Sequence, residues 1–564
     1  MPSASDILTL LLRPHELKSL VKLKLKIRGW KKRAASQEKD ADWEFCFDML
    51  NKVSRSFAIV IEQLGDELRN AICVFYLVLR GLDTVEDDMA IDKETKTRLL
   101  LDFHNSIEQD GFTLSYGYKD EKLLLEKFDC VVRAYKSLKP AYQTTIKDIT
   151  RRMAEGMQKF TTIKVETKAD YDLYCHYVAG LVGIGLSKLF ADSGLEDPSI
   201  ADSEFLANHM GLFLQKTNII RDFLEDHEDE NEETGDRRVF WPKEIWSKHT
   251  STLTDITFGK NSKIAVACLN EMVTDALQHV PYCLEYLSNI ENEENFLFCA
   301  IPQVMAAHTL SLCYNNPKIF EGEVRKNLGE CRNIRPVKLR KGTSARLMLE
   351  ASDMPAVLAI FEEAMDSIQD RIPDDDGSAV ETNACIQHVR DMIQQGRRSS
   401  SPTGKVGESA EAKLFKTVSR VAVDWSVVLT LVLIGATLAI DVPQTLLGVE
   451  QWSPLATRME GSVPLHGVMT FWSLVFYAAV TVMLCSGRGQ KLYTQLAAAH
   501  TGVSLMHCLV LLVSGASMIV MFFETAPRLL VGGCLFAVAC RQSMQCLTPS
   551  HFQNVRRRIS AGGH

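Results

Sequence analysis

Residues 76 to 88, YLVLRGLDTVEDD, place several charged side chains directly after an apolar run. The stretch contains no Pro and a single Gly, so it can form a helix. On a helix, Asp83 and Asp87 lie one turn apart on the same face, and Arg80 and Tyr76 extend the same stripe. A single acidic stripe of this kind is most simply a solvated helix face, so the stretch alone does not decide between water and a ligand.

A second acidic stripe changes this interpretation. Residues 211 to 226 read GLFLQKTNIIRDFLED, in which Asn218, Asp222 and Asp226 follow one another at intervals of one helical turn. Mg²⁺ prefers such oxygen ligands and commonly bridges carboxylates to the phosphates of a substrate. Two facing acidic stripes would repel each other unless cations lay between them. The pair of stripes therefore predicts a site for metal ions and a diphosphate.

Two arginines lie within one turn of these acids. Arg80 precedes Asp83 by three residues, and Arg221 directly precedes Asp222. A guanidinium group can bind two phosphate oxygens at once, so both arginines are candidates for holding the same diphosphate. Gln215 extends the second stripe by a further turn.

The stripes belong to a long region with helical periodicity. Apolar residues recur at spacings of three and four in residues 66–89, 141–163, 170–192, 203–227 and 262–288. Period-two runs of Val, Ile and Thr are scarce, so we predict an all-α catalytic domain over residues 41–393, preceded by a basic segment over residues 1–40. The formal net charge of −8 gives no support for a nucleic-acid-binding protein.

The composition changes after the catalytic domain. The polar residues 394–420 predict a flexible linker, because their Ser, Gly and Pro content cannot bury much apolar surface. Nearly charge-free segments of about bilayer length follow at residues 425–440, 463–485 and 501–523, with a shorter one at 529–540. We therefore predict a helical membrane region over residues 421–564 with three or four transmembrane helices.

The charges around these segments predict their orientation. The N-terminus has an apolar run before its Lys and Arg residues, which is the reverse of a signal peptide, so the catalytic domain is expected to face the cytosol. Four spans would then place Arg488, Lys491 and the C-terminal arginines on the cytosolic side, as the positive-inside rule requires. We favour four spans over three for this reason.

Six segments, in this order and spacing, closely resemble the squalene synthase (farnesyl-diphosphate farnesyltransferase) family: SRSFAIVI, YLVLRGLDTVEDD, YCHYVAGLVGIGLSKLF, GLFLQKTNIIRDFLED, FCAIPQVMA and VKLRKG. The resemblance covers roughly residues 40 to 375. It implies an isoprenoid-synthase helical bundle that couples two farnesyl diphosphates head to head to presqualene diphosphate. It also implies reduction to squalene by NADPH in the presence of Mg²⁺. With the predicted spans, it implies a monomer in the endoplasmic reticulum membrane.

The resemblance also assigns roles to individual residues. The metal ligands it implies are Asp83, Glu86, Asp87, Asn218, Asp222 and Asp226. The catalytic residues it implies are Tyr174, Arg80, Tyr76 and Phe298, with Tyr174 moving a proton and Phe298 facing the carbocation. The contacts it implies to NADPH or to phosphates are Arg55, Arg80, Arg221, Lys338 and Arg340. The contacts it implies to the farnesyl substrate are Ser54, Phe57, Gln215 and Arg221.

The glycines of GLVGIG do not form a dinucleotide-binding loop. Gly180, Gly183 and Gly185 are out of order for the GxGxxG pattern, and no strand precedes them. We expect these small residues to let helices approach closely instead.

Two other functions stay open at this point. A synthase of the same fold could stop at presqualene diphosphate or make phytoene without reduction, although the KLRK loop over residues 338–341 argues against both. A membrane scaffold with an inactive synthase-like domain is the alternative from another class, and the intact acids, Arg80 and Tyr174 argue against it. The segment over residues 325–336 looks inserted before the KLRK loop, and the membrane region is longer than that of the family.

Overall fold

The computed structural model of this chain describes residues 13–35, 40–54, 56–228, 240–257, 261–324, 332–334 and 337–399. Lys26–Gly404 form a compact unit of their own. Arg55, the linker beyond residue 399 and the spans predicted after residue 425 lie outside the described residues.

Helices make up nearly all of the described chain. The first half contains α2 (Pro14–Ala35), α3 (Ala41–Ser54), α4 (Ser56–Ile61), α5 (Asp66–Asp87), α6 (Lys93–Ser106), α7 (Lys119–Glu126), α8 (Phe128–Ser137), α9 (Pro140–Phe160), α10 (Lys168–Cys175), η1 (His176–Gly180) and α11 (Leu181–Ser193). The middle contains η2 (Pro198–Asp202), α12 (Glu204–Arg221), α13 (Phe223–Glu228), α14 (Lys243–Trp246), η3 (Leu253–Ile256), α15 (Ser262–Leu277), α16 (Val280–Ser288) and α17 (Glu293–Cys313). The last part contains η4 (Pro317–Phe320), β1 (Gly322–Val324), β2 (Arg332–Ile334), α18 (Lys341–Glu350), α19 (Met354–Gln369) and α20 (Ala379–Ser399).

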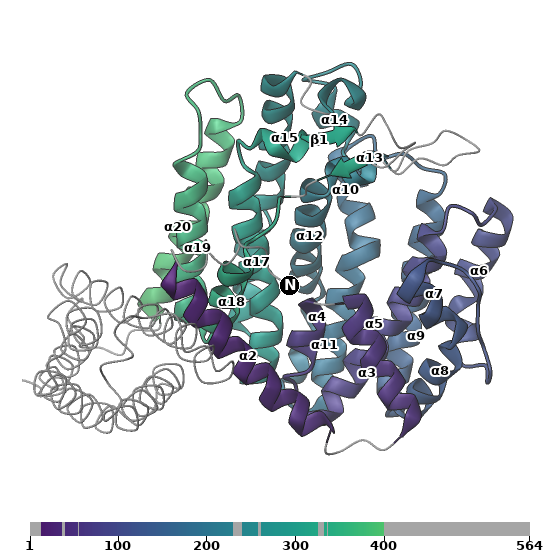
Figure 1. The fold of residues 1–564 in the computed structure, drawn as a ribbon. Coiled ribbons are helices and arrows are strands. Elements are labelled where there is room, and N and C mark those ends of the chain that lie inside the picture. The colour runs from purple at the N-terminus through teal and green to yellow at the C-terminus, as the bar shows by residue number, and fades with distance from the viewer. Residues whose placement is uncertain are drawn as a thin grey trace, which may run out of the picture. The chain divides into compact units, whose positions relative to one another are not determined.

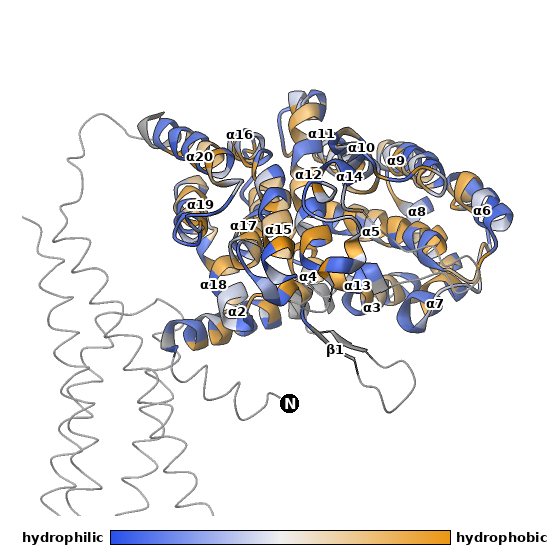
Figure 2. Ribbon diagram, turned by 90° about the horizontal axis from the view of Figure 1, so that it is seen from above, coloured by the Kyte–Doolittle hydropathy of each residue, from blue (hydrophilic) through white to orange (hydrophobic). Residues whose placement is uncertain are grey.

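The compact unit is a helical bundle built around a central group of helices. Figure 1 shows α4, α11, α12 and α17 in the middle, with α6 to α9 on one side and α19 and α20 on the other. In Figure 2 the central α17 is largely orange, whereas the peripheral α20 is mostly blue. This arrangement confirms the all-α fold predicted from the helical periodicity.

Helix α5 carries the first acidic stripe and is buried along most of its length. It packs against α3, α9 and α11 through apolar residues that include Phe75, Leu79 and Leu82. Gly81 leaves room for a neighbouring ring, because a Cβ at this position would lie 2.6 Å from the ring of Phe128. The glycine thus lets aromatic side chains pack directly against the backbone of α5.

Glycines also allow the close approach of α12 to the helices that precede it. A Cβ on Gly183 would lie 2.2 Å from the carbonyl oxygen of Ala207, and one on Gly211 would lie 2.2 Å from that of Ala179. A Cβ on Gly180 would lie 1.9 Å from the side chain of Asn208. These contacts confirm that GLVGIG is a helix-packing segment.

Several predicted helical segments are interrupted for local reasons. Residues 262–288 form α15 and α16, and Pro281 in the first turn of α16 has no N–H to continue the preceding helix. Residues 170–192 contain the π-helical turn η1 directly after α10. Such turns are often found at functional sites.

A short antiparallel hairpin is the main departure from an all-helical chain. β1 pairs with β2 through Gly322 opposite Ile334 and Val324 opposite Arg332. β1 ends directly before the predicted insertion over residues 325–336, and β2 lies within this segment, close to its end. A hairpin closes such an insertion with backbone hydrogen bonds close to its two ends, so the insertion need not disturb the helices around it.

Two helical stretches in the described residues are long and apolar enough to cross a membrane. They are Lys168–Ser193, which comprises α10, η1 and α11, and α17. In the most apolar 18 residues of each stretch, half or more are buried within the protein. Both α11 and α17 belong to the central group of helices in Figure 1. We assign them to the core of the bundle rather than to a membrane.

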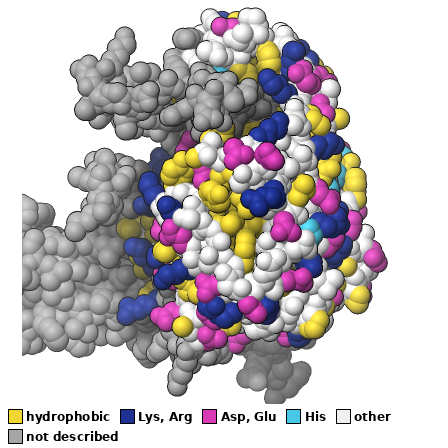
Figure 3. Space-filling view, turned by 90° about the vertical axis from the view of Figure 1, so that its right-hand side faces the viewer, with side chains coloured by type: hydrophobic (Ala, Val, Ile, Leu, Met, Phe, Trp, Pro, Cys, Tyr) yellow, Lys and Arg dark blue, Asp and Glu magenta, His cyan; other side chains and the backbone are white. Residues whose placement is uncertain are grey.

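The surface of the unit carries charges of both signs. Figure 3 shows the side on which α6 lies, with basic and acidic side chains interspersed. Ion pairs join neighbouring segments here, for example Lys147 to Glu108 at 2.5 Å.

At the other end of the unit, α20 continues to Ser399, beyond Gln394 where the linker was predicted to begin. Gln and Arg, which are good helix formers, dominate this last stretch.

Candidate active site

The first acidic stripe lies in the last turns of α5. The side chains of Asp83 and Glu86 are partly exposed and that of Asp87 is exposed, so all three are accessible to a ligand. Asp87 is the last residue of the helix. The Nζ of Lys96 donates to the carbonyl oxygen of Glu86 at 2.7 Å, which satisfies one of the free carbonyl groups at this helix end.

Arg80 is tied to this stripe by hydrogen bonding and charge. Its guanidinium donates to the hydroxyl of Tyr76 at 3.2 Å and lies over the same ring. Burial lowers the pKa of Arg80, but the carboxylate of Asp83, the hydroxyl of Tyr76 and the carboxylate of Asp87 outweigh it, so the pKa rises above its ordinary value. Arg80 therefore stays charged while partly removed from water, which suits a phosphate-binding group.

Asp88 has a different role from its acidic neighbours. It is buried, and its two carboxylate oxygens accept from the backbone N–H groups of Ala90 at 2.9 Å and Gly117 at 2.8 Å. Asp88 thus holds the loop after α5 to the segment before α7. The sequence alone did not separate this structural carboxylate from the accessible ones beside it.

The second acidic stripe runs across the end of α12 into α13. Helix α12 ends at Arg221, and Asp222 is its C-cap. The backbone N–H of Asp222 donates to the carbonyl of Asn218 at 2.8 Å, and that of Asp226 donates to the carbonyl of Asp222 at 3.0 Å. These bonds preserve the one-turn spacing that the sequence predicted, although the helix is interrupted.

Arg221 binds its neighbour Asp222 directly. The Nε of Arg221 donates to Oδ1 of Asp222 at 2.8 Å, and a second guanidinium nitrogen contacts Oδ2. Burial lowers the pKa of Arg221, but the bonds and charge of Asp222 outweigh it, so the pKa is raised. The guanidinium of Arg221 has several N–H donors, so it could bind a phosphate group while it keeps its bond to Asp222.

The two helices that carry the acidic stripes have a common neighbour. Both α5 and α12 pack against α11, so the helices that carry the two acidic stripes share one neighbour in the centre of the bundle. Gln215, which lies on α12 one turn before Asn218, is partly exposed and is not hydrogen-bonded through its side chain to another described residue.

Tyr174 lies in an aromatic environment at the end of α10. Its side chain is buried, its ring stacks on Phe240 with centroids 4.5 Å apart, and Phe160 contacts it edge-on at 5.3 Å. The π-helical turn η1 begins two residues later, and there His176 Nδ1 lies 2.8 Å from Oδ1 of Asn208 on α12. The segment around Tyr174 is therefore fixed to the helix that carries the second stripe.

The other predicted aromatic residues lie on two different helices. Phe57 on α4 contacts the ring of Tyr76 with centroids 6.1 Å apart, so it adjoins the first stripe. Phe298 on α17 is buried and meets Phe190 of α11 edge-on at 6.1 Å. Phe57 is 38% exposed, which leaves part of its ring free to contact a substrate.

The remaining predicted residues are less closely connected to the stripes. Lys338 and Arg340 are exposed and precede α18, of which Arg340 is the N-cap. The hydroxyl of Ser54 donates to the carbonyl of Leu50 at 2.7 Å within α3.

A sequence model of the squalene/phytoene synthase family matches residues 50–332, which include both stripes and Tyr174. This chain belongs to the squalene/phytoene synthase family. Its relatives include squalene synthase 11 of Panax ginseng, 45% identical over 385 residues, which are 68% of this chain and 87% of that protein. They also include human squalene synthase, 44% identical over 380 residues, which are 67% of this chain and 86% of that protein.

Solved structures of the family agree with this assignment. The complex of TcSQS with the ligand E5700 matches with a TM-score of 0.59 and 46% identity, over 63% of this chain and 99% of that one. The complex of TcSQS with BPH1237 matches equally well. The helical bundle described above is therefore the squalene synthase fold.

Sequence reasoning missed one feature of α12, the helix that carries most of the second stripe. Lys216 on α12 is 1% exposed, and its Nζ lies 2.5 Å from a carboxylate oxygen of Asp172 on α10 and 2.6 Å from one of Asp275 on α15. It also lies 4.9 Å above the ring of Tyr171. A Lys inside the apolar run GLFLQKTNII was the available signal, because a buried Lys requires paired acids.

Tyr171 lies beside this buried ion pair. Its hydroxyl is buried and is not hydrogen-bonded to any described residue. Burial raises the pKa of Tyr171 well above its usual value, and nearby negative groups that include Asp226 raise it further. The hydroxyl therefore stays protonated beside a predicted metal ligand.

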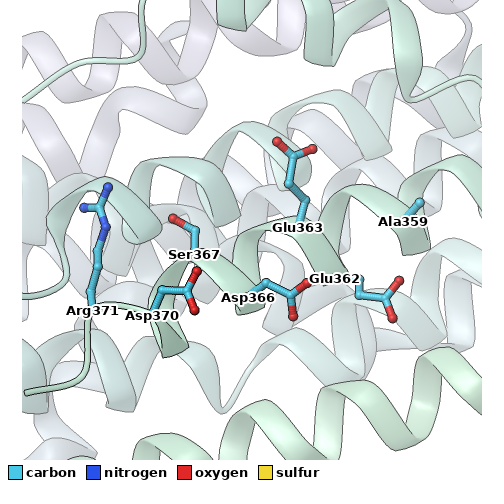
Figure 4. Close-up of a pocket in the computed structure, with 7 residues that line it drawn as sticks. All are labelled: Ala359, Glu362, Glu363, Asp366, Ser367, Asp370 and Arg371. Atoms are coloured by element: carbon cyan, nitrogen blue, oxygen red, sulfur yellow. The ribbon is translucent and has the colours of Figure 1, made fainter. Parts of the chain in front are cut away.

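A surface hollow over α19 is separate from the predicted site. Figure 4 shows it lined by Ala359, Glu362, Glu363, Asp366, Ser367, Asp370 and Arg371. Two of its acids have basic partners on neighbouring helices, since Glu363 pairs with Arg346 at 2.8 Å and Asp366 with Arg390 at 2.5 Å. None of the predicted site residues lies on α19, and we assign these acids to helix packing.

Proposed function

We propose that this chain is a squalene synthase that couples two farnesyl diphosphates to presqualene diphosphate and then reduces this intermediate to squalene. The observation that carries the proposal is the presence, in one bundle, of two accessible acidic stripes that each have an arginine, together with Tyr174 between aromatic rings. Relatives of 44% to 45% identity over most of their length are squalene synthases.

The two stripes fit Mg²⁺ that is shared with a substrate. Their donors are carboxylate and amide oxygens, which this hard cation prefers. Within the described residues, no three His, Cys, Asp or Glu side chains lie close enough to hold an ion by themselves. The proposed ions are therefore ones held by one or two carboxylates per stripe together with diphosphate oxygens, the usual way in which proteins bind Mg²⁺. Bound Mg²⁺ would neutralise the charge that develops on a departing diphosphate.

The protein's own residues would orient the diphosphates and protect the carbocation. Arg80 and Arg221 are charged and partly buried, so each could bind phosphate oxygens directly. The neighbouring acids would bind the same phosphate group through a metal ion. Phe57 and Phe298 offer apolar surface that excludes water, which would otherwise quench a carbocation. The hydroxyl of Tyr174 would hold the proton that is lost as the cyclopropane ring forms.

Lys338 and Arg340 support the proposed use of NADPH. Both are exposed cations immediately before α18, and such side chains would bind the phosphates of the dinucleotide. NADPH would supply the hydride for the second step. Arg55, the other cation that the resemblance assigns to this role, lies outside the described residues.

We further propose that the enzyme is a monomer anchored in the endoplasmic reticulum membrane, with the catalytic unit facing the cytosol. The apolar segments after residue 425 support an anchor, and the distribution of Lys and Arg supports this orientation. The product gives a physical reason for an anchor. The transfer of a C30 hydrocarbon from water to lipid is favourable by about 0.8 kcal/mol of free energy for each CH₂-sized unit, so the product partitions strongly into lipid.

A product assay on the full chain in lipid nanodiscs tests the proposal. With farnesyl diphosphate and Mg²⁺, we expect squalene only when NADPH is added and presqualene diphosphate to accumulate without it. Presqualene diphosphate under both conditions would show a one-step synthase. Conversion of a C20 diphosphate to phytoene, or no turnover, would favour the other two functions considered above.

A further inference from the structure

Helix α2 is strongly basic in a chain that is acidic overall. Its sequence, PHELKSLVKLKLKIRGWKKRAA, contains eight Lys or Arg residues and one Glu, whereas the whole chain has a net charge of −8. The helix lies N-terminal to the residues that the family model matches. None of the roles proposed above for the synthase uses this helix.

The side chains of α2 divide into two faces. Leu23 is buried, and Leu20 and Ile27 are partly buried, at spacings of three and four that place them on one stripe. The exposed side chains on the remaining arc are Lys22, Lys24, Lys26, Arg28 and, at 52% exposure, Leu25. None of these four cations forms an ion pair within the part of the chain that the structure describes.

We propose that the exposed basic face of α2 binds the anionic headgroups of the membrane in which the enzyme is anchored. Four unpaired cations around an exposed Leu match a surface that is negative at its headgroups and apolar below them. This proposal rests on the proposed membrane location, and it adds a second contact of defined chemistry to the C-terminal anchor.

The predicted anchor explains why a weak contact would be sufficient. A flexible chain of roughly 25 residues, the length of the predicted linker, has a root-mean-square end-to-end distance of about 30 Å. Such a tether raises the effective concentration of lipid headgroups near α2. Even modest attraction per cation would then keep α2 on the membrane, and added salt would weaken it.

The test places a photo-crosslinking amino acid at Leu25 in the full chain, which is then reconstituted into nanodiscs. Discs of phosphatidylcholine alone are compared with discs that contain about 30 mol% phosphatidylserine, and adducts are identified by mass spectrometry. We expect at least about fivefold more lipid adduct on the discs with phosphatidylserine, and loss of this excess in about 0.5 M NaCl.

A charge-matched pair of variants tests the residues. Lys22→Gln, Lys24→Gln, Lys26→Gln and Arg28→Gln combined should abolish the dependence on phosphatidylserine. Gln at four exposed lysines elsewhere, Lys93, Lys119, Lys263 and Lys318, changes the net charge equally and should leave the dependence intact.

Equal adduct yield on both kinds of disc would overturn the proposal, as would adducts formed mainly with the protein itself. Squalene production is measured on the same discs. If squalene is absent while the dependence on phosphatidylserine is present, the proposed activity fails and the lipid contact stands; the reverse result rejects the lipid contact alone.

Discussion

Arg80 donates a hydrogen bond to the hydroxyl of Tyr76, one turn earlier on α5, at 3.2 Å. The same Tyr ring contacts Phe57 of α4, so one aromatic side chain joins a phosphate-binding candidate to a substrate-binding candidate. Tyr76 therefore restricts the positions that the guanidinium can occupy beside Asp83. Held in this way, Arg80 would need less reordering when a diphosphate binds.

Tyr76→Phe should weaken substrate binding without destroying the site. The variant keeps the aromatic contact and removes one hydrogen bond to a charged group, worth about 1 to 2 kcal/mol. We expect the KM for farnesyl diphosphate to rise roughly five- to thirtyfold, with a smaller change in kcat. Tyr118→Phe is the control, because Tyr118 is 68% exposed and lies before α7. An unchanged KM would show that Arg80 does not depend on Tyr76.

Lys216→Met should destabilise the protein strongly. It leaves the carboxylate of Asp275, which is itself buried, without its main partner, and breaking a buried ion pair costs about 3 to 5 kcal/mol. Adding Asp275→Asn should restore part of the melting temperature of the detergent-solubilised enzyme. Lys52→Met, at an exposed pair with Asp48, should change it little. Equal effects of the two Lys variants would contradict a buried role for Lys216.

His279 should make the protein less stable as the pH falls. Burial, the charge of Lys216 and the neighbouring His209 hold the pKa of His279 well below its ordinary value of 6.5. A lowered folded-state pKa means that the unfolded chain takes up the proton first, so stability is complete above pH 6.5 and decreases below it by up to about 1.4 kcal/mol per pH unit.

The measurement for His279 is the melting temperature between pH 7.5 and pH 5.5. His279→Gln should flatten this dependence, whereas His388→Gln, at an exposed position, should leave it unchanged. If the melting temperature of His279→Gln still falls with pH as in the unsubstituted protein, groups other than His279 cause the pH dependence.

Gly183→Ala should disturb the contact between α11 and α12. The new methyl group would lie 2.2 Å from the carbonyl oxygen of Ala207, a backbone atom that cannot move without shifting a helix. Overpacking of this kind costs about 1 to 3 kcal/mol, so we expect a lower melting temperature. Gly377→Ala, where nothing lies within 4 Å of the added atom, should have little effect. Matching behaviour of both variants would contradict the close helix packing.

The sequence predicted the fold class because long segments with a period of three to four residues leave few alternatives. It could not predict where those segments break. Pro281 marks one break, but η1 after Tyr174 and the turn at Asp222 carry no comparable signal. The hairpin of β1 and β2 was missed because strands this short are set by pairing rather than by composition.

The candidate site was predictable where spacing on one helix carries the information. Asp83, Asp87 and Arg80 are neighbours because they share α5, and the sequence showed this directly. Contacts between helices were beyond the sequence. The ion pair of Lys216 with Asp275 joins residues far apart in the chain. Asp88 differs from Asp87 through its burial and through its bonds to Ala90 and Gly117.

The most direct test of the central claim is Mg²⁺-dependent release of diphosphate from farnesyl diphosphate by the full-length enzyme in a single turnover. If both acidic stripes hold metal for the departing diphosphate, Asp83→Asn and Asp222→Asn should each slow release by at least about a thousandfold. The exposed Asp375→Asn should match the unsubstituted enzyme. Release at an unchanged rate in either stripe variant would contradict the account.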